Sequence, residues 1–254
     1  MKTLLATLAP CVLLAVAAVA ASTGARQDAP PAPEAAPVGH KVSGKVLYDG
    51  PRPEAKPLSI AAEQAKGCCA DGSSVDATDP ALVVDDKNGL KNAVVEIDVK
   101  DAKLVVPKEA IVVDQRKCVF DPHVVVVPAG ATVRFLNSDG VAHNVRAQSL
   151  KNDSFNKTMA PGGKDEVVFA NADKVKINCD YHPWMSNWVY VTDKPFHALT
   201  AADGSFSVEG VPPGAWKVKV WHETLGRGEG EVVVGADGKV AALELKLAPK
   251  KKKA

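Results

Sequence analysis

The sequence lacks three features that would assign it to a common functional class. Charge of one sign is not in excess, because 31 lysine and arginine residues balance 30 aspartate and glutamate residues, so no bulk preference for nucleic acid is present. After the N-terminal segment no apolar run approaches membrane length, and we expect the remainder to be soluble. No Gly-rich phosphate loop and no Ser, His and Asp set stands out, which disfavours nucleotide and acyl chemistry.

Helical patterns are also scarce. Residues 59–66 could form a short helix at most, whereas short runs of β-branched residues recur between Gly, Pro, Asn and Asp. The runs that indicate strands are residues 94–99, 124–127, 131–137, 167–169, 188–191 and 217–220. Short strands with such regular interruptions favour sandwiches or barrels, so we predict an all-β fold.

The two ends of the chain indicate its compartment. Residues 1–21, an apolar run behind Lys2 with small residues near its end, predict a secretory signal, and a retained anchor is the alternative. Residues 22–39 are rich in Ala and Pro and predict a semi-extended linker. The Lys-rich tail at 249–254 predicts at most a weak contact with an anionic membrane surface. We therefore expect an exported protein, either periplasmic or extracellular.

The segment 179–185, Cys-Asp-Tyr-His-Pro-Trp-Met, carries the most specific chemistry. It supplies a thiolate from Cys179, an imidazole from His182 and a thioether from Met185. Soft sulfur ligands together with imidazoles suit a copper ion that alternates between Cu(I) and Cu(II). If Cys179 ends a strand, the short loop can bring these three side chains round one ion, and Pro183 stiffens the loop by fixing φ.

A second imidazole is available from His143, which follows the predicted strand 131–137 and a Ser-Asp-Gly turn. Two other interpretations of these residues are open. Cys179 and His182 could be half of a structural zinc site, although zinc fingers repeat the paired spacing and have no use for a Met placed further on. Met185 could instead fill a gap in the core, but its register after His182 favours a ligand.

The His-Asn pair, the Cys-x2-His loop followed by Met and the flanking strands resemble the cupredoxins of the amicyanin and plastocyanin type, over about residues 99–192. The resemblance implies a Greek-key β-sandwich with one type 1 copper ion. The implied ligands are His143, Cys179, His182 and Met185. The implied residues around them are Asn144, Pro183 and Trp184, of which Asn144 would hydrogen-bond to the segment that carries the thiolate.

The same resemblance implies one-electron transfer. In cupredoxins electrons usually leave through the exposed edge of the imidazole equivalent to His182, so Pro183 and Trp184 would belong to a docking surface for a redox protein, such as a cytochrome, a dehydrogenase or an oxidase. Copper storage or delivery is one alternative, but only three Met residues occur. An interaction module on a degenerate cupredoxin scaffold is another, and the complete ligand set argues against it. We expect no enzyme, because the His-x-His pairs of a trinuclear copper centre are absent.

Three further pieces resemble the carboxypeptidase regulatory-like domains, which are small prealbumin-type β-sandwiches. They are the strand and turn at 42–50, the strand at 88–97 and a strand-turn-strand at 199–218 with Asp-Gly-Ser-Phe before Pro-Pro-Gly. The copper-type segment lies between the second and the third piece. We therefore predict a cupredoxin domain at 100–195, inserted in or adjacent to a discontinuous sandwich at 40–99 and 196–248. A linear order of separate modules is the alternative.

Four of the five cysteines follow the signal. If Cys179 is a ligand, a disulfide is expected between Cys118 and either Cys68 or Cys69, because the exported compartment preserves disulfides and a bridge between direct neighbours would be strained. Alternatively, Cys118 and His123 could be part of a second metal site.

Overall fold

The computed structural model describes residues 39–54, 57–69, 72 and 74–249. Every regular element in this part is a strand, from β1 to β16, so the predicted all-β fold is confirmed. The short helix considered for residues 59–66 is wrong, since residues 62–67 form turns. No helix in the described ranges could cross a membrane. The predicted signal at 1–21, the linker up to residue 38 and the tail beyond residue 249 lie outside the described residues.

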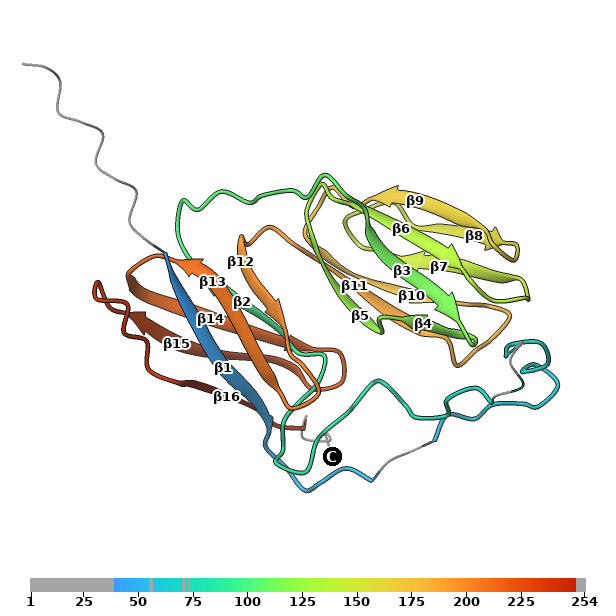
Figure 1. Ribbon diagram of the computed structural model, residues 1–254, viewed down its shortest axis with the longest axis horizontal. Helices are drawn as coiled ribbons and strands as arrows, with labels where there is room; N and C mark the ends of the chain where they lie inside the picture. The colour runs from blue at the N-terminus through green and yellow to red at the C-terminus, as the bar shows by residue number, and fades with distance from the viewer. Residues whose placement is uncertain (1–38, 55–56, 70–71, 73, 250–254) are drawn as a thin grey trace, which may run out of the picture. The chain divides into compact units, whose positions relative to one another are not determined.

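Strands β3 to β11 form two sheets that we call sandwich A (Figure 1). One sheet has the order β4-β3-β6-β9 and the other the order β5-β11-β10-β7-β8. The bounds are β3 Ile111–Arg116, β4 Val119–Asp121, β5 Val124–Pro128, β6 Thr132–Asn137, β7 His143–Gln148, β8 Phe155–Met159, β9 Lys164–Val168, β10 Asp173–Asn178 and β11 Ser186–Thr192.

The burial pattern of these strands explains why the sequence forms two layers. In β6 every second side chain is buried, as the period of a strand with one covered face requires. The continuous valine run of β5 is covered on both faces. Val125 and Val127 belong to the core of sandwich A, whereas Val124 belongs to a cluster shared with the rest of the chain. A strand covered on both sides has no need of polar alternation.

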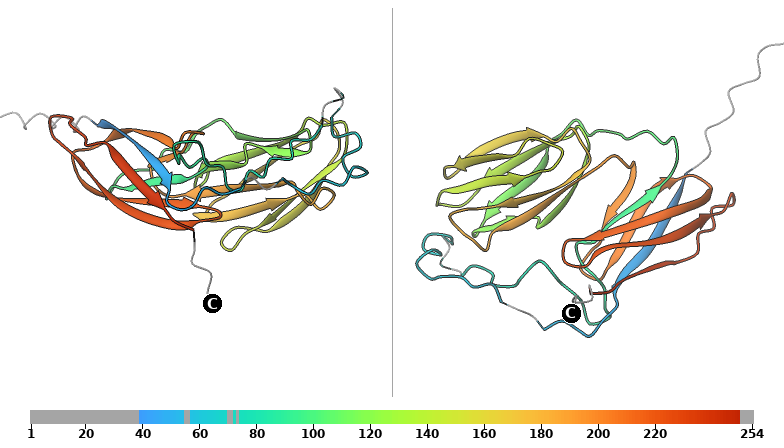
Figure 2. Two further views of the ribbon diagram at one scale, coloured as in Figure 1. Left: turned by 90° about the horizontal axis from the view of Figure 1, so that it is seen from below. Right: turned by 180° about the vertical axis from the view of Figure 1, so that it is seen from behind.

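The remaining strands form two further sheets that we call sandwich B, with the orders β13-β1-β16 and β12-β2-β14-β15. Figure 2 shows these sheets and those of sandwich A in two further views. The bounds are β1 His40–Tyr48, β2 Val94–Asp98, β12 Phe196–Leu199, β13 Ser205–Val211, β14 Gly214–His222, β15 Gly226–Val234 and β16 Leu243–Leu247.

Strand pairing in sandwich B joins distant parts of the sequence. β1 lies between β13, which is antiparallel to it, and β16, which is parallel to it. β2 lies between β12 and β14 and is antiparallel to both. Segments on the two sides of sandwich A in sequence therefore share sheets, and their side chains fill one core that includes Val46, Ile97 and Val218.

The two sandwiches meet at an aromatic cluster. Trp221 of β14 packs against Trp188 and Tyr190 of β11, with ring centroids 5.4 and 5.2 Å away. Beside it, the Glu223 carboxylate accepts a hydrogen bond from Trp188 Nε1 at 2.8 Å and contacts His123 Nε2. His123 and Glu223 are nearly buried, so this contact joins β11 and the start of β5 to the end of β14.

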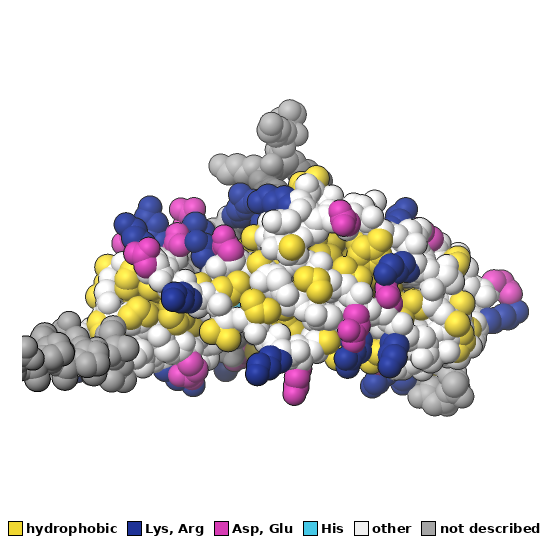
Figure 3. Space-filling view, turned by 90° about the horizontal axis from the view of Figure 1, so that it is seen from above, with side chains coloured by type: hydrophobic (Ala, Val, Ile, Leu, Met, Phe, Trp, Pro, Cys, Tyr) yellow, Lys and Arg dark blue, Asp and Glu magenta, His cyan; other side chains and the backbone are white. Residues whose placement is uncertain are grey.

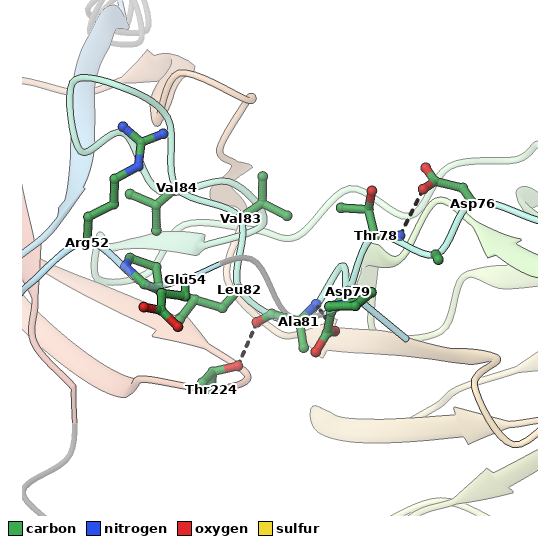
Figure 4. Close-up of a pocket in the computed structure, with 13 residues that line it drawn as sticks. Arg52, Glu54, Asp76, Thr78, Asp79, Ala81, Leu82, Val83, Val84 and Thr224 are labelled. Atoms are coloured by element: carbon green, nitrogen blue, oxygen red, sulfur yellow. Dashed lines mark hydrogen bonds between the residues drawn. The ribbon is translucent and has the colours of Figure 1, made fainter. Parts of the chain in front are cut away.

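Between β1 and β2, the described residues 49–54, 57–69, 72 and 74–93 lead from sandwich B to sandwich A and back (Figures 1 and 2). We call this segment the strap. A disulfide between Cys68 of the strap and Cys118, in the turn between β3 and β4, ties it to sandwich A. Its two limbs border a hollow of about 1000 Å³ (Figure 4), where the Thr224 hydroxyl donates to the Ala81 carbonyl at 2.6 Å.

The surface carries charges of both signs side by side. Figure 3 shows lysine and arginine side chains interspersed with aspartate and glutamate across one face. The face in this view therefore has no dominant sign of charge. Exposed ion pairs among the described residues include Arg134 with Glu166 at 2.7 Å and Lys157 with Asp165 at 2.6 Å.

Candidate metal centre

The four predicted ligands lie at one end of the five-stranded sheet of sandwich A. His143 is the first residue of β7, Cys179 directly follows β10, and Met185 directly precedes β11. β10 pairs with both β7 and β11, so these strand ends are neighbours in space. His182 lies in the loop that joins β10 to β11.

Two backbone hydrogen bonds close this loop. The Met185 N–H donates to the His182 carbonyl at 2.9 Å, and the Cys179 N–H donates to the Met185 carbonyl at 3.2 Å. The bonds fold residues 179–185 into a compact turn, and the side chains of Cys179 and Met185 belong to the same buried cluster. The local sequence therefore holds sulfur and imidazole groups together before any ion binds.

The donor atoms of three ligands converge. Nδ1 of His143 lies 3.0 Å from Nδ1 of His182, and Cys179 Sγ lies 3.9 and 3.7 Å from these nitrogens. A metal bonded at about 2.0 Å to nitrogen and about 2.3 Å to sulfur in a trigonal arrangement would separate such atoms by about 3.5 to 3.7 Å. Shifts of a few tenths of an ångström would therefore admit an ion, so the donor set fits a copper centre.

The surroundings of Cys179 favour the thiolate. Burial raises the pKa of this thiol, but a hydrogen bond with His143 and backbone N–H groups of Asn144, His182 and Tyr181 outweigh burial and hold the pKa below its usual range. A deprotonated sulfur is the form that binds a metal.

A buried carboxylate orients His143. Nε2 of His143 lies 2.8 Å from Asp139 Oδ2, so the imidazole donates to the carboxylate there and turns Nδ1 toward Cys179. Burial lowers the pKa of His143, but hydrogen bonds to Asp139 and Cys179 and the attraction of their charges raise it above its usual value. Asp139 also accepts the backbone N–H groups of Lys117 and Cys118 at 2.5 and 2.8 Å.

The side chain of Asn144 links two strands beside the centre. Its Oδ1 accepts the Asp180 N–H at 2.6 Å, directly after Cys179, which is the contact expected of this residue. Its Nδ2 donates to Asp180 Oδ2 at 3.0 Å and to Asn156 Oδ1 at 2.6 Å. Asn144 therefore ties the beginning of β7 to the loop that carries the sulfur.

The expected docking surface needs a correction. His182 and Trp184 are only 6% and 8% exposed, so of the three residues of that surface only Pro183 is exposed. The indole Nε1 of Trp184 donates to the Cys118 carbonyl at 2.9 Å, and Cys118 Sγ lies 3.9 Å from His182 Nε2. The turn between β3 and β4 and the strap bonded to it cover these side chains, and no local sequence pattern indicates such a cover.

The second metal site considered for Cys118 and His123 is not formed. Cys118 is joined to Cys68, and both ring nitrogens of His123 have partners elsewhere. Nδ1 lies 3.1 Å from the carbonyl of Ser186, the residue after Met185, and Nε2 contacts Glu223. Cys69 is a free thiol.

In the sequence, Asp139 is recognisable only as a turn residue. The available signal was a carboxylate four residues before an imidazole ligand, separated from it by a glycine turn. Glu223 gave no comparable signal, because its partners Trp188 and His123 lie 35 and 100 residues away in the sequence.

Residues 107–192 match the model of a family described as copper binding proteins, plastocyanin/azurin family. This part of the chain is therefore similar to the cupredoxins, which supports copper binding and electron transfer in general. No curated protein matches the chain. The likeness of sandwich B to carboxypeptidase regulatory-like domains stays a prediction.

Solved structures with a similar part include a purple cupredoxin from Nitrosopumilus maritimus, 24% identical with a TM-score of 0.29, where the match covers 32% of this chain and 99% of that one. Amicyanin from Paracoccus versutus is 25% identical with a TM-score of 0.30, covering 39% and 97%. A copper-containing nitrite reductase from Thermus scotoductus SA-01 is 21% identical with a TM-score of 0.32, covering 38% of this chain and 25% of that enzyme. The expected lack of enzymatic activity stays a prediction.

Proposed function

We propose that the part of this chain similar to the plastocyanin/azurin family holds one type 1 copper ion through His143, Cys179, His182 and Met185, and that the protein carries single electrons. The convergence of two imidazole nitrogens and one sulfur within 3.9 Å, in a buried position, is the observation that supports this most strongly. Bound copper would supply a one-electron couple.

The chain's own residues prepare the site for such a couple. Asp139 fixes the orientation of His143, and the hydrogen bond with His143 together with backbone N–H groups lowers the pKa of Cys179 and so favours its thiolate form. The side chains of His143, Cys179 and His182 are all less than 7% exposed, so water is largely excluded. A preorganised and dry donor set needs little rearrangement when the charge at its centre changes.

The rest of the proposed role concerns place and architecture. We propose an exported protein, in the periplasm or outside the cell, that exchanges electrons with a redox protein of the cell envelope. We also propose that the cupredoxin domain at 100–195 is inserted in a sandwich formed by 40–99 and 196–248. The pairing of β1 with β13 and β16 and of β2 with β12 and β14 supports the insertion.

The test is the visible spectrum of the copper-loaded full chain, oxidised and then reduced. A thiolate bound to Cu(II) is intensely coloured and loses its colour on reduction. Cys179→Ser should abolish the colour and leave the sandwich folded, because a hydroxyl fills the space but does not replace the soft anion. Met185→Leu should only shift the colour and the potential.

Cys69→Ser is the matched control, because Cys69 is a free thiol on the strap and should leave the colour unchanged. Colour that persists in Cys179→Ser would place the centre elsewhere. Copper that is handed irreversibly to an acceptor protein and never cycles would replace electron transfer with copper delivery.

A further inference from the structure

The outer edge of the His182 ring faces the strap. Nε2 of His182 lies 3.9 Å from Cys118 Sγ, the sulfur through which Cys68 of the strap is attached. The Sγ of Cys68, also on the strap, lies within 4.8 Å of a ring nitrogen of the same imidazole, which is 6% exposed. A partner that collects electrons at this edge therefore meets the strap first.

The strap tip, which we define as residues 57–69 and 74–80, lies close against sandwich A. Leu58, Ile60 and Ala65 pack on the buried cluster that contains Cys179. Gly67 has a φ of +82°, and a Cβ there would lie 2.7 Å from Val141 Cγ1, in the loop before His143. The tip thus lies over both loops that carry the proposed ligands.

The attachment of the tip depends on few bonds. The backbone hydrogen bonds of residues 57–69 and 74–80 stay within the strap, as between Leu58 and Ala77 or between Cys68 and Ala65, and none of those described runs to a strand of sandwich A. The covalent tie to that sandwich is the Cys68–Cys118 disulfide. A segment held by one covalent bond and by side-chain packing opens more readily than a paired strand.

We propose that the strap tip is a lid over the His182 edge and that the Cys68–Cys118 disulfide locks it. The proposal rests on the copper site proposed above. In the closed state the lid keeps redox proteins from the imidazole, and in the open state His182, Pro183 and Trp184 become the docking surface that the cupredoxin resemblance implies.

A dithiol reductant unlocks the lid by thiol–disulfide exchange when a local opening of the tip exposes Cys68, which is 2% exposed in the closed state. One thiolate of the reductant attacks Cys68 Sγ, the bond to Cys118 breaks, and Cys118 leaves as a thiolate that takes up a proton. The second thiol of the reductant then displaces Cys68 and completes a disulfide in the reductant. Two electrons pass from the reductant to the cystine, and copper takes no part in this exchange.

The first measurement needs no copper. Diethyl pyrocarbonate modifies accessible imidazoles, and mass spectrometry of the metal-free full chain reports each histidine separately. In Cys68→Ser/Cys118→Ser, which lacks the bridge and leaves no free thiol at either bridge position, we expect His182 to react about tenfold faster or more, because the tip opens once its tie is gone. The half-buried His40 should react at an unchanged rate, and Cys69→Ser should match the wild type.

A second variant keeps the bridge. Ile60→Asp places a charge against the apolar cluster, so it should loosen the tip and raise the reactivity of His182 to a smaller extent. If removal of the disulfide prevents folding, this variant tests whether the strap tip covers His182. Unchanged reactivity of His182 in both variants, or in the one that folds, overturns the lid.

The second measurement uses the copper-loaded protein. The rate constant for oxidation of the Cu(I) form by hexacyanoferrate(III) should rise by about tenfold or more in the variant without the bridge, since the oxidant then reaches the ring edge. An unchanged rate beside increased reactivity of His182 overturns its role as the electron exit. Absence of colour from the wild type overturns the copper proposal, while the reactivity of His182 still tests the cover.

Discussion

Asp139 connects the proposed metal ligand to the disulfide loop. Its carboxylate contacts His143 Nε2 and accepts the N–H groups of Lys117 and Cys118, which both have positive φ values in the tight turn between β3 and β4. Residues in that conformation need partners for their exposed backbone groups. One buried side chain therefore orients an imidazole and stabilises the turn that anchors the strap.

Asp139→Asn keeps the shape of this side chain and removes its charge. We expect the copper affinity to fall by about 10–100-fold, because the carboxylate no longer supports His143 as a ligand. The potential should rise, since a negative charge near the ion favours Cu(II). Competition with a chelator measures the affinity, and Asp153→Asn on the exposed surface is the control. An affinity within twofold of the wild type would show that Asp139 serves only the turn.

His222 makes stability depend on pH. Burial lowers its pKa to about 4, and the attraction of Glu223 opposes this only in part. In the unfolded chain the imidazole binds a proton near pH 6.5, whereas in the folded protein it stays neutral until about pH 4. Protonation therefore favours the unfolded state, and the free energy of unfolding falls as the pH falls from 6.5 to 4. The loss amounts to about 3 kcal/mol.

The comparison for this prediction is His222→Asn, whose side-chain oxygen can still accept the Thr224 N–H and does not titrate. Urea denaturation of both metal-free proteins between pH 7 and pH 4 gives the free energy of unfolding. The wild type should lose about 3 kcal/mol more than the variant. If the free energy of unfolding falls with pH by the same amount in both proteins, His222 has the same pKa in the folded and the unfolded state.

At the scale of elements, β11 connects the metal loop to sandwich B. It begins directly after Met185, and His123 Nδ1 lies 3.1 Å from the carbonyl of its first residue, Ser186. Glu223 at the end of β14 contacts His123 and accepts from Trp188 of β11. Sandwich B therefore braces the strand that follows the ligand loop.

Glu223→Gln removes the negative charge that contacts His123 and keeps an oxygen acceptor for Trp188. We expect the protein to lose about 1.5–3 kcal/mol of stability, the usual value of a hydrogen bond to a charged group. The colour of the copper-loaded protein should shift slightly, because the start of β11 is held less firmly. Glu229→Gln on β15, an exposed position, is the control for both readings. A loss no larger than in the control would mean that the contacts of Glu223 with His123 and Trp188 do not contribute to the free energy of unfolding.

Elements with a local signal were predictable. The loop from Cys179 to Met185 presents its donors within seven consecutive residues, and β5 shows its burial as a run of valines. The disulfide from Cys118 to Cys68 or Cys69 was predicted from the cysteine count, and the structure forms it with Cys68. The position of the strap over His182 and the contact of His123 with Glu223, 100 residues apart, were not predictable. Such contacts arise when whole sheets meet, and no hydrophobic period encodes them.

At the scale of the whole molecule, the strands of sandwich A are consecutive in sequence, whereas those of sandwich B come from two separate segments. The division expected from the resemblance of residues 42–50, 88–97 and 199–218 to one domain family stays a prediction, which this strand pairing supports. The side chains at the joint could not be assigned in the same way. The sequence shows the three aromatic residues of the joint only as strand residues, and their contact is visible once their strands are placed together. They are Trp188, Tyr190 and Trp221.

The pairing of β1 has a consequence for the order in which the molecule forms. β1 is the first described strand to be synthesised, and its neighbours β13 and β16 come from the end of the chain, where His40 pairs with Val211 and Gly44 with Leu243. Contacts this far apart form slowly, and an unpaired strand exposes its edges to other chains. Sandwich A can therefore fold while β1 is still unpaired. A chaperone that shields β1 until β13 and β16 are synthesised would raise the yield of native protein.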